Sequence, residues 1–106
     1  MSVAPEVSVV MGVRNGGEEL APSVESILAQ RDIALELIVV DDGSTDGTAE
    51  RLAAFAARDA RVRVSRQEPS GLTAALVRGC DVARAPMIAR NDAGDRSHPE
   101  RLRRQK

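Results

Sequence analysis

Two pairs of aspartates, far apart in the sequence, are the residues best suited to chemistry. Asp41 and Asp42 directly follow one apolar run, and Asp92 and Asp95 follow another much later in the chain. Carboxylates accept hydrogen bonds from ligand hydroxyls and coordinate hard divalent cations. Each pair is therefore a candidate binding site for a hydroxyl-rich or cation-carrying ligand.

The first pair closes a buried strand. The run 37–40 (LIVV) is short and rich in β-branched residues, which predicts a strand buried on both faces. Asp and Ser commonly close strands and cap helices, so a structural role is the alternative. Because Asp46 or Thr45 can cap the next helix, we expect no structural role for Asp41 and Asp42. Adjacent carboxylates repel unless a cation, a donor-rich ligand or a basic side chain lies between them.

Strand and helix patterns alternate along the whole chain. This order predicts an α/β fold, a Rossmann-like three-layer α/β/α arrangement with a mainly parallel four-stranded sheet. The short alternating segment 62–66 is typical of an edge strand. In the helix 72–83 we expect Leu72 and Leu76 to face inward, and a further helix begins near His98. The predicted strands are 7–13, 37–40, 62–66 and 87–90, and the other helices are 20–30 and 48–58.

The predicted topology brings the two aspartate pairs together. In a doubly wound sheet the strands after the first and third helices flank the first strand, and ligands bind outside the carboxyl ends of the strands. Both pairs should then open into one crevice beside Val13 and Arg14. A nucleotide sugar supplies the hydroxyls and the cation-binding diphosphate that suit such a crevice.

Composition excludes several functions. The 106 residues suffice for one domain, and a net charge of −1 provides no positive field to attract nucleic acid. Phe55 is the only aromatic residue, so the bases of single-stranded nucleic acid find no stacking surface.

Cys80 is the only cysteine, which excludes an internal disulfide and favours a buried thiol. Without a basic leader we expect a cytoplasmic location, at the inner face of the membrane if the full-length protein carries an anchor.

The chain resembles the amino-terminal, donor-binding half of family 2 glycosyltransferases with the GT-A fold. The resemblance covers nearly all of residues 1–106 and rests on several motifs in the right order. These motifs are VSVVMGVRNGGEELAPSVESILAQ, ELIVVDDGSTDGT, RDARVRV, SGLTAALVRG and IARNDAGDRSHPERLRRQ.

The resemblance implies roles for particular residues. Val13, Arg14 and Asp42 would hold the base and ribose of a nucleotide sugar, with Asp41 supporting them. The Asp-Xaa-Asp motif of the family matches Asp92-Ala93-Gly94-Asp95. Within it, Asp92 would contact the ribose, and Asp92 with Asp95 would bind a divalent cation, manganese or magnesium.

Three departures from the family pattern affect these roles. Gly94 stands where the most common form carries the metal-binding acid, so only Asp95 can substitute from the next position. Arg14 stands where an aromatic residue is frequent, so stacking on the base would use a guanidinium plane. Pro69 replaces a common Asn before Ser-Gly and removes an amide from the rim of the crevice.

The implied function is transfer of a sugar, with inversion, from a UDP, GDP or dTDP sugar to an acceptor hydroxyl of unidentified glycan, lipid or protein. The family places the acceptor site and the general base later in the chain, so we expect that base beyond residue 106 and no transfer by residues 1–106 alone. The alternative is a non-catalytic or truncated relative that serves as a nucleotide-binding or interaction module. A truncated sheet also exposes apolar surface, which predicts a homo-oligomer.

Two other functions fit less well. A phosphoacceptor signalling domain needs a further aspartate at a strand end, where this chain has Ser65, Arg66 and Gln67. A dinucleotide-binding domain needs spaced glycines after the first strand, which RNGGEEL lacks.

Overall fold

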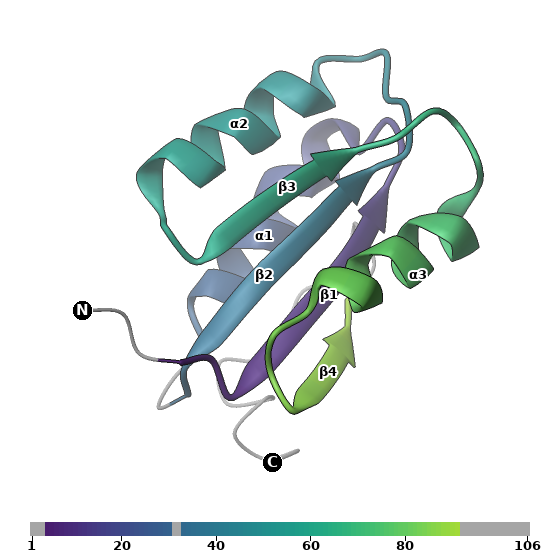
Figure 1. Cartoon of the computed structure of the whole chain (residues 1–106). Helices are drawn as coiled ribbons and strands as arrows, with labels where there is room; N and C mark the ends of the chain where they lie inside the picture. The colour runs from purple at the N-terminus through teal and green to yellow at the C-terminus, as the bar shows by residue number, and fades with distance from the viewer. Residues whose placement is uncertain (1–3, 31–32, 92–106) are drawn as a thin grey trace.

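The protein folds around one parallel sheet. The structure, a computed structural model, describes residues 4–30 and 33–91. Four strands pair in the order β3-β2-β1-β4, so the predicted parallel sheet with residues 62–66 at one edge is confirmed (Figure 1). The strands are β1 (Val7–Val13), β2 (Leu35–Asp41), β3 (Val62–Arg66) and β4 (Met87–Arg90). β2 is longer than its apolar run because it pairs with β1 from Leu35 to Asp41.

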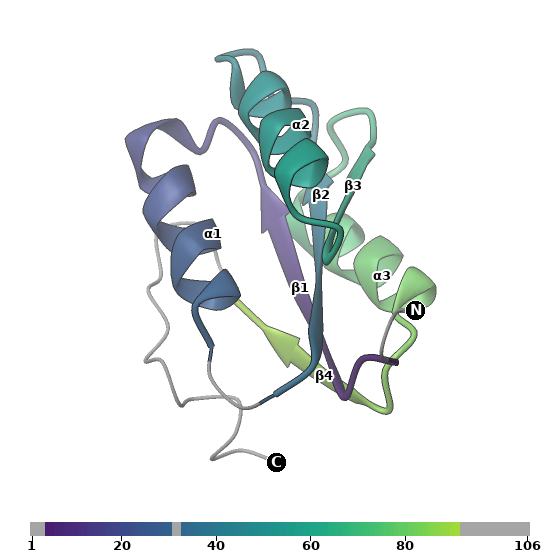
Figure 2. The ribbon, with the colours of Figure 1, turned by 90° about the vertical axis from the view of Figure 1, so that its left-hand side faces the viewer.

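Helices cover both faces of the sheet. Figure 2 shows α1 and α2 on one face and α3 on the other, which is the predicted three-layer arrangement. The helices are α1 (Leu20–Leu28), preceded by the short 3-10 turn η1 (Gly17–Glu19), α2 (Thr48–Arg58) and α3 (Leu72–Val82). No helix among residues 4–30 and 33–91 is long and apolar enough to cross a membrane. The helix predicted near His98 lies outside the described residues.

The two faces of the sheet pack differently. The larger apolar cluster joins alternate residues of β1 and β2, such as Val9 and Leu37, to α1 and α2. The smaller cluster lies under α3 and contains Ile38, Val40 and Ala75. On this side α3 contacts the sheet through Ala75 and Gly79, both buried. Small residues at the contact let the helix backbone approach the sheet closely.

This close approach overturns two predictions about α3. Leu72, predicted to face inward, is 49% exposed, and Cys80, predicted to be buried, is exposed. A helix whose contact face consists of Ala and Gly lies too close to the sheet to place large side chains beneath it. The larger side chains therefore lie at the flanks of the helix.

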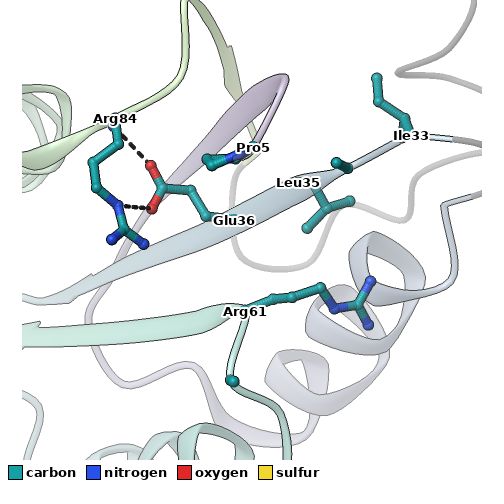
Figure 3. Close-up of a pocket in the computed structure, with 8 residues that line it drawn as sticks. Pro5, Ile33, Leu35, Glu36, Arg61 and Arg84 are labelled. Atoms are coloured by element: carbon teal, nitrogen blue, oxygen red, sulfur yellow. Dashed lines mark hydrogen bonds and ion pairs between the residues drawn. The ribbon is translucent and has the colours of Figure 1, made fainter. Parts of the chain in front are cut away.

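A buried carboxylate organises the amino end of the sheet. Glu36, on β2, accepts hydrogen bonds from the Ser8 hydroxyl, from Arg63 Nη1 at 3.0 Å and from Arg84, through its backbone N at 2.8 Å and its Nε at 3.2 Å. Figure 3 shows the contact with Arg84 beside a cavity of about 350 Å³. Burial alone would raise the pKa of Glu36, but these hydrogen bonds outweigh burial and lower the pKa from 4.5 to about 2.

Glu36 makes the fold sensitive to acid. A carboxyl group whose pKa is lower in the folded chain stabilises it above the unfolded pKa, and the contribution disappears as pH falls from 4.5 to about 2. The lost free energy of unfolding should be about 3 kcal/mol. Urea unfolding of Glu36→Gln at several pH values should show a flatter acid limb than the wild type. Glu25→Gln, an exposed change on α1, is the control and should keep the wild-type slope.

Gly79 is required by the packing of α3. A Cβ at this position would lie 2.4 Å from Val10 Cγ1, and a β-branched valine has little freedom to move. Gly79→Ala should lower the free energy of unfolding by about 1–3 kcal/mol, because overpacking exceeds the gain in helix propensity. Thr73→Ala, at an exposed position of α3, is the control, because it raises helix propensity without adding a contact with the sheet. A Gly79→Ala variant as stable as the wild type would contradict the close contact.

Candidate functional site

The candidate site lies where β1 and β2 end. Val13 pairs with Asp41, and the backbone N of Asp42 donates to the Val13 carbonyl at 2.8 Å, so both chains leave the sheet together. A cavity of about 280 Å³ opens here. Its lining is formed by Gly12, Val13, Arg14, Asn15, Gly16, Glu19 and Leu72. The structure thus places two of the predicted site residues, Val13 and Arg14, on the wall of a cavity.

Asp42 is buried and fixed by the loop that leads into α3. Its Oδ1 accepts hydrogen bonds from Gln67 Nε2 and the Ser70 backbone N, each at 2.8 Å, and its Oδ2 accepts from the Gly71 backbone N at 3.0 Å. The bond from Gln67, those from the two backbone groups and the charge of Arg14 lower the pKa of Asp42. The carboxylate is therefore ionised at neutral pH.

Asp41 fixes the turn that follows β2. Its Oδ1 accepts from the Ser44 backbone N at 2.9 Å. Its Oδ2 is buried without a hydrogen bond, and the nearest cation is Arg66, whose Nη1 lies at 3.9 Å. Arg66 also donates from Nη2 to the Ser44 carbonyl at 3.0 Å. Asp41 and Arg66 thus bind the backbone N and the backbone carbonyl of Ser44.

The expectation that Asp41 and Asp42 have no structural role was therefore wrong. Both carboxylates accept backbone N–H groups of turns that would otherwise be unsatisfied. Successive strand residues also point to opposite faces of the sheet. Asp41 lies on the side of Val13 and α2, whereas Asp42 meets the start of α3. The repulsion between the two carboxylates is reduced because they lie on opposite faces of the sheet and accept hydrogen bonds from different donors.

Gly43 joins these two turns tightly. Its φ is +76°, and a Cβ there would lie 2.5 Å from Cγ of Pro69. An L side chain would be strained by the backbone and would clash with the proline ring. Pro69, noted in the sequence as a departure from the family, packs against the aspartate corner at this point.

The turn after β1 is also bonded to the turn after β2. Asn15, Gly16 and Gly17 each donate a backbone N–H to a side chain of the segment 44–48. Asp46 also accepts from the Thr48 backbone N at 3.1 Å, but the N-cap residue of α2 is Gly47, so neither Asp46 nor Thr45 occupies the cap position that the sequence predicted. Asn, Gly, Ser and Thr favour turns in both segments, but these residue types do not identify the hydrogen-bond partners of a turn.

The described residues do not form a cation site by themselves. Within residues 4–30 and 33–91 no group of three or more His, Cys, Asp or Glu side chains could hold a metal ion. Asp42 uses both oxygens for hydrogen bonds, and Asp41 Oδ2 has a guanidinium as its neighbour. The predicted ligands Asp92 and Asp95 lie outside the described residues.

A parallel α/β sheet with a cavity and an ionised carboxylate at the carboxyl ends of its central strands defines a Rossmann-like α/β domain, with its candidate site where such domains bind ligands. The family model described as Glycosyl transferase family 2 matches residues 8–105, and the chain belongs to this family.

Similar proteins agree with this assignment. EpsE of Bacillus subtilis is 40% identical over 99% of this chain, which spans only 38% of that relative's length. The fragment 1-349 of TarS of S. aureus, solved in complex with UDP, superposes with a TM-score of 0.85 at 23% identity, covering 94% of this chain and 30% of that fragment. The mannosyltransferase PcManGT from Pyrobaculum calidifontis, in complex with GDP-Man and Mn2+, superposes with a TM-score of 0.77 at 25% identity. The match covers 88% of this chain and 28% of the PcManGT chain. The GT-A likeness of the fold is confirmed.

The environment of Asp42 can be tested by titration. Gln67 donates the hydrogen bond that most lowers the Asp42 pKa, so Gln67→Leu should raise that pKa. The measurement is a carboxyl carbon NMR titration of Asp42 in both proteins. Glu68→Gln changes the neighbouring exposed residue and should leave the titration as it is. An unchanged Asp42 pKa in Gln67→Leu would show that this hydrogen bond is absent in solution.

Proposed function

We propose that this chain supplies the donor-binding site of a glycosyltransferase that uses a nucleoside diphosphate sugar. Family membership supports sugar transfer as the class of reaction. The single observation that carries the donor site is the cavity walled by Val13 and Arg14 beside the ionised, buried Asp42. PcManGT, a relative of similar fold, binds GDP-Man, which supports a nucleotide sugar as the ligand.

Asp42 has capacity for one further donor. A carboxylate offers about four lone-pair sites, and Gln67, Ser70 and Gly71 occupy three of them. The remaining site on Oδ2 would accept an N–H of the base or a ribose hydroxyl. The guanidinium of Arg14 is planar and would stack on the base.

The proposed reaction is a displacement with inversion. The acceptor hydroxyl oxygen forms a bond to the anomeric carbon while the bond from that carbon to the diphosphate oxygen breaks. The electron pair leaves with the diphosphate, and a general base takes the hydroxyl proton. Asp41 supports the donor site by holding its turn, and Asp92 would reach the donor from the end of β4. Asp92 and Asp95 would hold a divalent cation, which would neutralise negative charge on the diphosphate.

The general base and the acceptor site belong to the rest of a longer protein in this proposal. The chain spans 38% of the length of EpsE, so that relative has ample length for both. We therefore propose that residues 1–106 bind a donor weakly and transfer no sugar. A full-length protein that binds donor and transfers nothing would favour the nucleotide-binding module instead.

Calorimetric titration of UDP, GDP and dTDP sugars, with and without manganese, tests the donor site. We expect weak binding of one donor class, weakened about threefold to tenfold in Arg14→Ala by loss of the stacked cation. Arg78→Ala removes an exposed arginine from α3 and should bind as the wild type does. Absence of heat with every donor, in a chain shown to be folded, would refute the proposal.

A further inference from the structure

Three consecutive backbone N–H groups after β1 are already occupied in the protein. Asn15 N donates to Ser44 Oγ at 2.8 Å, Gly16 N to Thr48 Oγ1 at 3.0 Å, and Gly17 N to Asp46 Oδ2 at 3.2 Å. A glycine-rich turn that binds phosphate directs such groups at the ligand. Here the acceptors are side chains of the DGSTDGT segment, so these N–H groups are not available to a phosphate.

The segment after β2 and helix α2 also donate hydrogen bonds back to the turn after β1. The Thr45 backbone N donates to Asn15 Oδ1 at 2.8 Å, and Arg51 Nη1 donates to the Gly17 carbonyl at 3.1 Å. Asn15 has a φ of +52°, a left-handed conformation that needs support from its surroundings. The side chain of Asn15 and the hydroxyl of Ser44 provide that support.

Burial makes the two hydroxyls hard to replace. Thr48 is fully buried and Ser44 is 5% exposed. The donors are less buried, since Asn15 is exposed and Gly16 is half-buried, and both hydrogen bonds are partly buried. Loss of either hydroxyl removes the acceptor on the interior side of the turn. The conformation of the turn thus depends on these two side chains.

The turn held in this way forms the wall of the cavity. Arg14, Asn15 and Gly16 line it, and the backbone of this segment determines where the Arg14 side chain begins. We propose that Ser44 and Thr48 are positioning residues, which hold the Asn15–Gly17 turn so that the cavity accepts a donor nucleotide, and that the diphosphate binds elsewhere. The positioning role rests on the proposed donor site.

Thr48→Val tests this role with little change in volume. It removes the acceptor of Gly16 N, and we expect the Gly16 amide to exchange its hydrogen about tenfold faster, with a similar loss of affinity for the sugar nucleotide that binds the wild type. Thr73→Val is the matched control, because it makes the same change at an exposed position of α3, outside the contacts that hold the Asn15–Gly17 turn. Thr48→Ser keeps the hydroxyl and should restore both values.

The two readouts separate the two proposals. If no sugar nucleotide binds the wild type, the donor site is refuted and the positioning role with it, while exchange at Gly16 still decides whether the contact exists. Unchanged exchange in Thr48→Val overturns the positioning role. Faster exchange with unchanged affinity also overturns it, since the turn would then not shape the cavity. Ser44→Ala, assayed through the Asn15 amide, replaces Thr48→Val if that variant does not fold.

Discussion

The parallel pairing of β1 with β2 is the constraint on which the site depends. Both strands are buried along their whole length, and the register joins Val13 to Asp41 at their carboxyl ends. Because both faces of these strands are buried, specific contacts distinguish this register from its neighbours, such as the Ser8 hydroxyl on Glu36 and the close approach of Val10 to Gly79. The turn after β1 and the turn after β2 therefore leave the sheet side by side, close enough for their side chains and backbone to bond.

Buried polar groups hold both ends of the sheet, by similar means. At the amino end Glu36 joins Ser8 of β1 to Arg63 of β3 and to Arg84 after α3. At the carboxyl end Asp42 joins β2 to the loop before α3. Each carboxylate stays ionised because several donors compensate for the loss of water. The segments at the two ends of α3 thus contact both carboxylates, Glu36 through Arg84 and Asp42 through Gly71.

Prediction from sequence succeeded where a pattern repeats along the chain. The predicted residue ranges are confirmed for β1, β3, β4 and α2. The spacing of apolar residues shows which side chains are buried, and so whether a segment is a strand or a helix. Prediction was wrong where a single contact decides the outcome. The roles of Asp41 and Asp42 depend on Ser44, Gln67, Ser70 and Gly71, and only Ser44 lies close in sequence. Likewise Cys80 is exposed because Gly79 and Ala75 take the contact with the sheet.

The sequence by itself determined the kinds of elements, their order, the α/β class and the membership of the chain in Glycosyl transferase family 2. Hydrophobic periodicity and local motifs suffice to predict these features, because both depend only on residues close together in the sequence. Only the tertiary structure decided which donors satisfy the aspartates and that the Asn15–Gly17 N–H groups face Ser44, Asp46 and Thr48. The physical reason is that a hydrogen bond needs two groups within about 3 Å, and strand register, not sequence distance, brings them there.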